Sequence, residues 1–227
     1  MDTVQIRKYR HEDDEEAVRE MFTVGMSEHV PTAFMHALKQ PLVQMVLMCV
    51  FCALLTSSMS FLLPVLAVTL LLAGVRQVAS HATAKYIDFR LRTDLAHIDD
   101  VYLAGKDACF WVAESEGRVV GMVACRPAPD VDNAGCAELK RMSVRRSHRG
   151  TGVGKALCRT VVAFARERGF AAVVLCTSVL MADARSLYRH MGFTETREIS
   201  LPEFLPKILN YNLVQFRLDL QNNDKRD

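Results

Sequence analysis

The chain has 227 residues, which suits one domain of ordinary size with an appendage and is hardly long enough for a second full domain. Charged residues make up 24% of the sequence and the formal net charge is only +2, so no global field argues for nucleic acid or another polyanionic partner. The seven cysteines are odd in number and lie mostly in apolar runs, which is typical of reduced thiols and indicates that the soluble part faces the cytosol.

The chain begins with a predicted strand and a predicted helix. Polar and apolar residues alternate over residues 4–10, as in a strand, and Asp13 and Asp14 are placed to cap the helix that follows. The apolar face of this helix would consist of Ala17, Val18, Met21 and Phe22. Residues 1–39 therefore supply the first strand and helix of the soluble domain.

A long apolar segment follows. The 36 residues from Gln40 to Val75 contain no Asp, Glu, Lys, Arg or His, and they begin too far from Met1 for a cleavable signal peptide. Apolar blocks at 42–55 and 61–74 flank a polar break, which predicts a helical hairpin in the lipid bilayer over residues 40–76. Cys49 and Cys52 lie in this segment without a second pair or nearby histidines, so we expect no metal site there.

The exact form of the membrane segment stays open. A bilayer core about 30 Å thick needs about 20 helical residues per span, and each apolar block is shorter, so two short spans and a re-entrant hairpin both fit. One tilted span is the alternative. The flanking basic residues would then place the C-terminal side in the cytosol, whereas a hairpin places both flanks there. These residues are Lys39 before the segment and Arg76, Lys85, Arg90 and Arg92 after it.

The rest of the chain alternates between predicted strands and helices. A polar loop is expected at 127–135, and an alternating strand near the C-terminus is expected over 214–220. The other elements are a short helix at 94–102, strands at 108–113, 119–125, 138–144 and 171–177, helices after residue 152 and at 182–191, and a strand that opens at 191–193.

The most informative stretch is the basic, glycine-rich turn at 145–155, between a strand and an amphipathic helix. Glycines let consecutive backbone N–H groups approach a ligand, and the start of a helix adds partial positive charge, so this turn is suited to a pyrophosphate. The nucleotide-binding patterns with a Walker lysine or with G-x-G-x-x-G spacing both fail here. The spacing that matches is R-x-x-G-x-G, formed by Arg149, Gly152 and Gly154.

Residues 149–154 resemble the acetyl-CoA pyrophosphate loop of the GNAT superfamily of N-acetyltransferases, and residues 184–193 resemble the family's A-x-x-L-Y-x-x-x-G-F block. The order of elements is similar to that family across nearly the full chain. The membrane hairpin after the first helix, together with residues 6–9 and 109–115, resembles the camello-like, N-acetyltransferase 8 group of endoplasmic-reticulum enzymes.

The resemblance implies an α/β (α+β) fold of the GNAT type. This fold has a mixed, mostly antiparallel central sheet flanked by helices, here with the membrane hairpin inserted. Residues 1–39 and 80–220 would form the acetyltransferase domain around the hairpin at 40–76, and residues 221–227 would form a polar tail. Because the first strand belongs to the same sheet as the later ones, this fold requires a hairpin and excludes a single span.

The resemblance also implies site residues. Tyr188 would be the general acid near the coenzyme sulfur, and Glu138 would be the general base, although a core tyrosine and a surface glutamate are the plainer interpretations. A backbone N–H on the strand at 142–144 would polarise the acetyl carbonyl. The residues expected to bind acetyl-CoA are Met142, Ser143, Val144, Arg149, Gly150, Thr151, Gly152, Val153, Gly154 and Lys155.

The implied activity is the transfer of an acetyl group from acetyl-CoA, without a metal, to a primary amine by direct attack in a ternary complex. A cysteine S-conjugate or a protein lysine is favoured as acceptor, with aspartate also acetylated in the wider group. The connection at 201–210 would border the acceptor pocket and rest on the bilayer. The alternative is a non-catalytic membrane-hairpin protein that serves interaction or acetyl-CoA sensing; the oligomeric state is not predicted.

Overall fold

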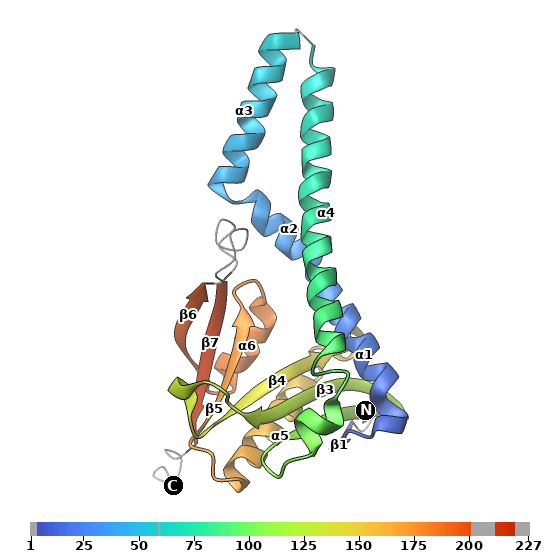
Figure 1. Ribbon diagram of the computed structural model, residues 1–227, viewed down its shortest axis with the longest axis vertical. Helices are drawn as coiled ribbons and strands as arrows, with labels where there is room; N and C mark the ends of the chain where they lie inside the picture. Colours follow the sequence, from blue (N-terminus) through green and yellow to red (C-terminus); the bar gives the residue numbers. More distant parts are fainter. Residues whose placement is uncertain (1–3, 59, 201–211, 221–227) are drawn as a thin grey trace.

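The computed structural model describes residues 4–58, 60–200 and 212–220. Its strands form one seven-stranded sheet in the order β1-β2-β3-β4-β5-β7-β6 (Figure 1). Among the strands of the described residues, only β4 and β5 pair in parallel, so the predicted mixed, mostly antiparallel sheet is confirmed. The strands are β1 Gln5–Lys8, β2 Cys109–Ser115, β3 Arg118–Pro127, β4 Cys136–Val144, β5 Ala172–Ser178, β6 Thr194–Ser200 and β7 Asn212–Asp219.

Helices flank both faces of the sheet, as expected. They are α1 His11–Ser27, α2 Val30–Leu38, α3 Pro41–Ser58, α4 Leu62–Arg92, α5 Val153–Glu167 and α6 Ala182–His190. The start of α1 differs slightly from expectation. It begins at His11, and the carboxylate of Asp14 in its first turn accepts a hydrogen bond from the backbone N–H of Arg10 at 2.8 Å. Carboxylates in this first turn also stabilise the positive end of the helix dipole.

Each face of the sheet carries a large hydrophobic core. Alternating residues of β2 enter one or the other, because successive side chains of a strand point to opposite faces. Trp111 belongs to the core under α5 and α6, whereas Phe110 and Val112 belong to the core under α1 and α4. The apolar face predicted for the first helix is confirmed, with Val18, Met21 and Phe22 buried and Ala17 packed beside them.

The approach of α5 to the sheet depends on Gly121 in β3. A methyl group at this position would lie 2.9 Å from Leu157 Cδ1, 3.1 Å from Val153 Cγ1 and 3.2 Å from Ala113 Cβ. We therefore expect Gly121→Ala to destabilise the fold by about 1–3 kcal/mol, as overpacked cores do. Thermal unfolding of the purified protein measures this. Gly105→Ala is the control, because no atom lies within 4 Å of a methyl group there; equal melting temperatures for the two variants would contradict this account of the packing.

The predicted helical hairpin is present. Helices α3 and α4 contact one another and project away from the sheet as a long arm (Figure 1). Within the described part of the chain, these two helices are long and apolar enough to cross a membrane by length and composition, and both have a mean hydropathy of 1.9 in their most apolar stretch. Their apolar side chains lie largely on the outside, so the arm exposes an apolar surface instead of burying these side chains in a core.

One continuous helix, α4, joins the arm to the part of the molecule that contains the sheet. Helix α4 runs through residue 76, where the apolar segment was expected to end, and stops only at Arg92. Its second half contacts α1, and Ile87 is buried in the core beneath it. The sequence beyond the apolar block is polar but contains alanines, which favour helix. The helix therefore continues past the point where the apolar residues end. Helix α2 was not predicted.

The other strands and helices expected within the described residues are present, with local differences. The short helix expected at 94–102 is a turn followed by a π-helical segment, Asp99–Leu103. In β7, Gln215 is buried rather than half exposed, because its side chain donates a hydrogen bond to Asn133 in the loop that follows β3. The connection at 201–210, which was expected to border an acceptor pocket, and the tail at 221–227 lie outside the described residues.

Candidate functional site

Strands β4 and β5 separate as they run toward their C-terminal ends. Their parallel pairing is limited to Cys136–Glu138 with Ala172–Val174, after which β4 continues to Val144 and β5 to Ser178 without pairing to each other. We call the segments that do not pair with each other, residues 139–144 of β4 and 175–178 of β5, the fork. Strand β3 still pairs with the outer edge of β4, and β7 with that of β5, so the fork is held open from both sides. In open α/β sheets, ligands bind outside the carboxyl ends of parallel strands, and β4 and β5 are a parallel pair.

The glycine-rich turn lies directly after β4 and leads into α5. Gly150 and Gly152 both adopt left-handed backbone, with φ of 78° and 96°, and no atom lies within 4 Å of where a methyl side chain on either would sit. Gly152 is the N-cap of α5. Within the described chain, the backbone N–H groups of residues 150–155 have no hydrogen-bond acceptor. Such a run of free donors at a helix start fits the pyrophosphate of acetyl-CoA.

The basic side chains of this turn differ in their contacts, since Arg149 is paired and Lys155 is exposed. Arg149 donates to the backbone carbonyl of Val144 at 2.9 Å and forms an ion pair with Glu28 at 2.7 Å. It therefore ties the end of α1 to the end of β4. Lys155 is exposed, and the hydroxyl of Thr151 donates to the carbonyl of His148 at 2.7 Å, which stabilises the turn. The backbone is thus the part of this turn that is free to bind an anion.

Tyr188 lies on α6 and reaches the fork from the α5 side of the sheet. It is buried among aromatic rings, with ring centroids 5.8 Å from Phe193 and 5.7 Å from Phe216, and its hydroxyl donates to Met142 Sδ at 3.5 Å. Burial raises the pKa of Tyr188 above its ordinary range, and Cys158 adds to the effect. The phenol therefore keeps its proton at neutral pH and can act as an acid but not as a base.

Glu138 is the last residue of β4 that pairs with β5, and its side chain lies on the opposite face of the sheet from Tyr188. Its neighbours Ala137 and Leu139 belong to the core that contains Tyr188, and side chains alternate along a strand. Both carboxylate oxygens of Glu138 are engaged, one by Lys140 Nζ at 2.8 Å and the other by Arg126 Nε at 3.2 Å. The structure thus brings Tyr188, Met142 and the turn together at the fork and places Glu138 at its base, facing away from them.

A β-bulge shapes the β4 half of the fork. Ala124 of β3 is paired with Lys140 and Met122 with Ser143, so one extra residue is accommodated in β4. Arg141 within the bulge has φ of 54°, an unusual value for a residue with a side chain. After the bulge Met142 and Val144 both pack against the core under α5.

Sequence reasoning missed a buried charge network next to this bulge. Arg141 Nε donates to Asp94 Oδ2 at 2.6 Å and its Nη2 donates to Oδ1 at 2.7 Å, while the hydroxyl of Tyr102 also donates to Oδ2 at 2.9 Å. Burial opposes ionisation of Asp94, but the hydrogen bonds and charge of Arg141 outweigh it and lower the pKa of this carboxyl. The partners are 47 residues apart along the chain, so no spacing in the sequence reveals the network.

His29 is a second residue that the sequence did not single out. It lies between α1 and α2, and burial together with the nearby charge of Arg149 lowers its pKa, so the imidazole is neutral at physiological pH. Only the approach of the glycine-rich turn to the end of α1 brings these two residues near each other, and this approach depends on the tertiary fold.

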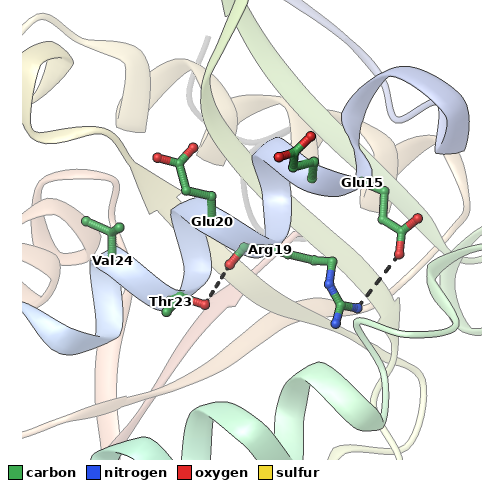
Figure 2. A pocket seen from close by; sticks show the side chains of 6 residues that line it. Glu15, Arg19, Glu20, Thr23 and Val24 are labelled. Atoms are coloured by element: carbon green, nitrogen blue, oxygen red, sulfur yellow. Dashed lines mark hydrogen bonds and ion pairs between the residues drawn. The ribbon is translucent and has the colours of Figure 1, made fainter.

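Two hollows on the surface of the described residues lie away from the fork. One is lined by residues of α1 alone, where Arg19 forms an ion pair with Glu15 at 3.8 Å and the hydroxyl of Thr23 donates to the carbonyl of Arg19 (Figure 2). Another lies between α1 and the turn after β4, lined partly by Arg7, Arg118 and His148. Among residues 4–58, 60–200 and 212–220, no group of three or more His, Cys, Asp or Glu side chains is placed to hold a metal.

Comparison with known proteins agrees with this geometry. Residues 75–193 match the model of the acetyltransferase (GNAT) family. N-acetyltransferase 8 of Rattus norvegicus is 40% identical over 95% of this chain and 97% of its own length. A probable N-acetyltransferase camello of Xenopus tropicalis is 35% identical over 98% of this chain and all of its own. A GNAT-family acetyltransferase of Staphylococcus aureus Mu50, 16% identical, covers 96% of this chain and all of its own with a TM-score of 0.56, which shows the same fold.

Proposed function

Because the chain belongs to the acetyltransferase (GNAT) family, and within it to the N-acetyltransferase 8 and camello group, we propose that it moves the acetyl group of acetyl-CoA directly to a primary amine in a ternary complex. A cysteine S-conjugate or a protein lysine is the favoured acceptor. The observation that carries the proposal is the convergence, at one fork, of a turn with free backbone N–H groups and a protonated tyrosine.

The donor is bound mainly by backbone. The N–H groups of residues 150–155 bind the pyrophosphate, while Lys155 adds exposed positive charge beside it. The acetyl end then extends along the fork toward Met142 and Tyr188. A backbone N–H of residues 142–144 polarises the acetyl carbonyl, so that the negative charge developing on the oxygen is stabilised during the reaction.

The reaction needs proton transfers on both sides of the acetyl group. The amine nitrogen forms a bond to the carbonyl carbon, the carbon–sulfur bond breaks, and the sulfur leaves with the electron pair. Tyr188 gives its phenolic proton to that sulfur, because a protonated thiol is a much better leaving group than a thiolate. The raised pKa of Tyr188 keeps this proton available at neutral pH.

The amine must lose a proton as it attacks, and Glu138 is the proposed acceptor of that proton. It faces the side of the sheet opposite to Tyr188, so the amine and the coenzyme would approach the fork from different faces. Both of its oxygens are held by cations, and Lys140 is the closer partner. The base role therefore requires that Lys140 or Arg126 shift when the acceptor binds.

The arm is proposed to lie in the endoplasmic-reticulum membrane with the catalytic domain in the cytosol. Strand β1 precedes the arm in sequence and β2 follows it, yet the two pair directly, with Gln5 opposite Glu114. This pairing keeps both flanks of the arm in one sheet, which supports a membrane hairpin over a single span. Apolar side chains on the outside of α3 and α4 suit contact with lipid.

Charges placed on the arm should release the protein from membranes. Leu66 and Leu70 of α4 are 56% and 63% exposed, and we expect Leu66→Arg combined with Leu70→Arg to weaken insertion by about 2.5–3.5 kcal/mol per arginine. The measurement is the fraction of protein that stays in the membrane pellet after an alkaline carbonate wash. Val131→Arg is the control, because Val131 is 90% exposed on the catalytic domain. If all variants partition alike, the arm is not a membrane anchor.

The competing interpretation is a non-catalytic protein that only binds acetyl-CoA. Protein purified in detergent is incubated with acetyl-CoA and either an S-benzyl cysteine, a lysine peptide or aspartate, and the release of CoA is followed. We expect turnover on one of these amines, and we expect acetyl-CoA to raise the melting temperature while ATP and NAD do not. Stabilisation by acetyl-CoA without turnover on any amine would favour the non-catalytic interpretation.

A further inference from the structure

The Arg141–Asp94 pair joins two parts of the molecule that are far apart in sequence. Asp94 follows the end of α4, the helix that comes from the arm, and Arg141 lies in the bulge of β4 at the fork. The two side chains are only 6% and 13% exposed, and they share two hydrogen bonds, at 2.6 and 2.7 Å. The Arg141 guanidinium also lies over the ring of Phe22 in α1, 5.3 Å from its centroid.

The pair has features that simple stabilisation does not explain. Taking a carboxylate and a guanidinium out of water is costly, and apolar residues of similar size often stabilise such a site as well or better. A left-handed backbone conformation at a residue with a side chain costs about 1–2 kcal/mol relative to the right-handed conformation. Strain of this kind is found where the local geometry serves a function. Here the strained residue is directly followed by the backbone assigned to the acetyl carbonyl.

Arg141 is also connected to Tyr188, the proposed acid, through the next residue along the chain. Met142 follows Arg141, and its Sδ accepts the hydrogen bond of the Tyr188 hydroxyl at 3.5 Å. The position of Arg141 therefore fixes both the direction of the backbone at 142–144 and the side chain against which Tyr188 rests. Asp94 is itself held by Tyr102, whose hydroxyl donates at 2.9 Å from the fully buried core under α1 and α4.

We propose that Arg141 and Asp94 are positioning residues. Their pair holds the bulge of β4 in the geometry that aligns the 142–144 backbone and Tyr188 for acetyl transfer. The same pair fixes the end of α4, the helix that comes from the arm, to the active site. This inference rests on the proposed function. Neither side chain touches the reacting atoms, since both lie in or beside the core under α1 and α4, whereas Tyr188 lies on the other face.

The test compares two buried carboxylates that each bind an arginine through two hydrogen bonds. Asp94→Asn weakens the pair at the bulge, and Asp14→Asn weakens the Arg7–Asp14 pair, whose hydrogen bonds are 2.6 and 2.8 Å and which does not touch β4. Both variants should melt at a lower temperature. Only Asp94→Asn should lower kcat, by about 10- to 100-fold as misaligned groups do, with the KM for acetyl-CoA unchanged.

Two milder variants keep the test decisive if Asp94→Asn does not fold. Tyr102→Phe removes one hydrogen bond to Asp94 and keeps the ring, and Arg141→Lys keeps the charge but cannot form the paired hydrogen bonds. Each should lower kcat severalfold at unchanged KM for acetyl-CoA. Wild-type kcat in the folded variants, or an equal fall in Asp14→Asn, would overturn the inference. Absence of turnover in the wild-type protein would instead overturn the proposed function.

Discussion

Replacing Tyr188 with phenylalanine should lower kcat by about 10²-fold, at the lower end of the range that general acids contribute, and leave the Kd of acetyl-CoA unchanged. The substitution keeps the ring that packs between Phe193 and Phe216 and removes only the hydroxyl near Met142. Turnover of the preferred amine at saturating acetyl-CoA measures kcat, and isothermal titration measures Kd.

Tyr9→Phe provides the matched control. Tyr9 is also buried, and burial raises its pKa to about 12, but it lies in the core under α1, away from the fork. We expect wild-type kcat for this variant. Because the pKa of Tyr188 is raised, its ionisation should cause no loss of activity below about pH 10, the ordinary pKa of tyrosine. Wild-type kcat in Tyr188→Phe, or the same loss in Tyr9→Phe, would show that Tyr188 is not the acid.

Replacing Gly152 with alanine should weaken acetyl-CoA binding by about tenfold, which corresponds to about 1.4 kcal/mol. Gly152 has φ of 96°, where a residue with a side chain is strained, and relief of that strain turns the neighbouring N–H groups away from the pyrophosphate. Titration of the purified protein with acetyl-CoA measures the effect.

The other end of the same helix supplies the control for this change. Gly169 also has a positive φ, 75°, and no atom lies within 4 Å of where its methyl group would sit. Gly169→Ala should therefore carry similar backbone strain and a similar loss of melting temperature, with the Kd of acetyl-CoA unaffected. If both variants bind acetyl-CoA equally well, the turn at 150–155 does not hold the coenzyme.

Local patterns in the sequence predicted much of this structure. The continuous apolar runs of β2 and β3 and the apolar face of α1 are short-range features, and burial of both faces of the strands and of one face of the helix follows from them directly. The hairpin was predicted from composition, because a polar break between two apolar blocks leaves helix on either side. The R-x-x-G-x-G spacing predicted the turn because left-handed backbone at Gly152 depends on glycine itself.

Features that depend on long-range contacts could not be predicted in this way. The bulge at Arg141 has no glycine or proline to mark it, and the side chain of this residue pairs with Asp94 from a distant segment. Arg149 was assigned to the coenzyme from its motif, but its ion pair with Glu28 depends on where α1 ends. The roles of Glu138 and Tyr188 stay predictions, because the chemistry of each is decided by a bound acceptor and donor.

The central claim is direct acetyl transfer from acetyl-CoA to an amine, and a two-substrate initial-velocity experiment on the wild-type protein tests it most directly. CoA release and acetylated amine are measured together while both substrate concentrations are varied. The account predicts one CoA released per amine acetylated and double-reciprocal lines that intersect, as a ternary complex requires. Parallel lines, or no CoA release above background with any of the amines, would contradict it.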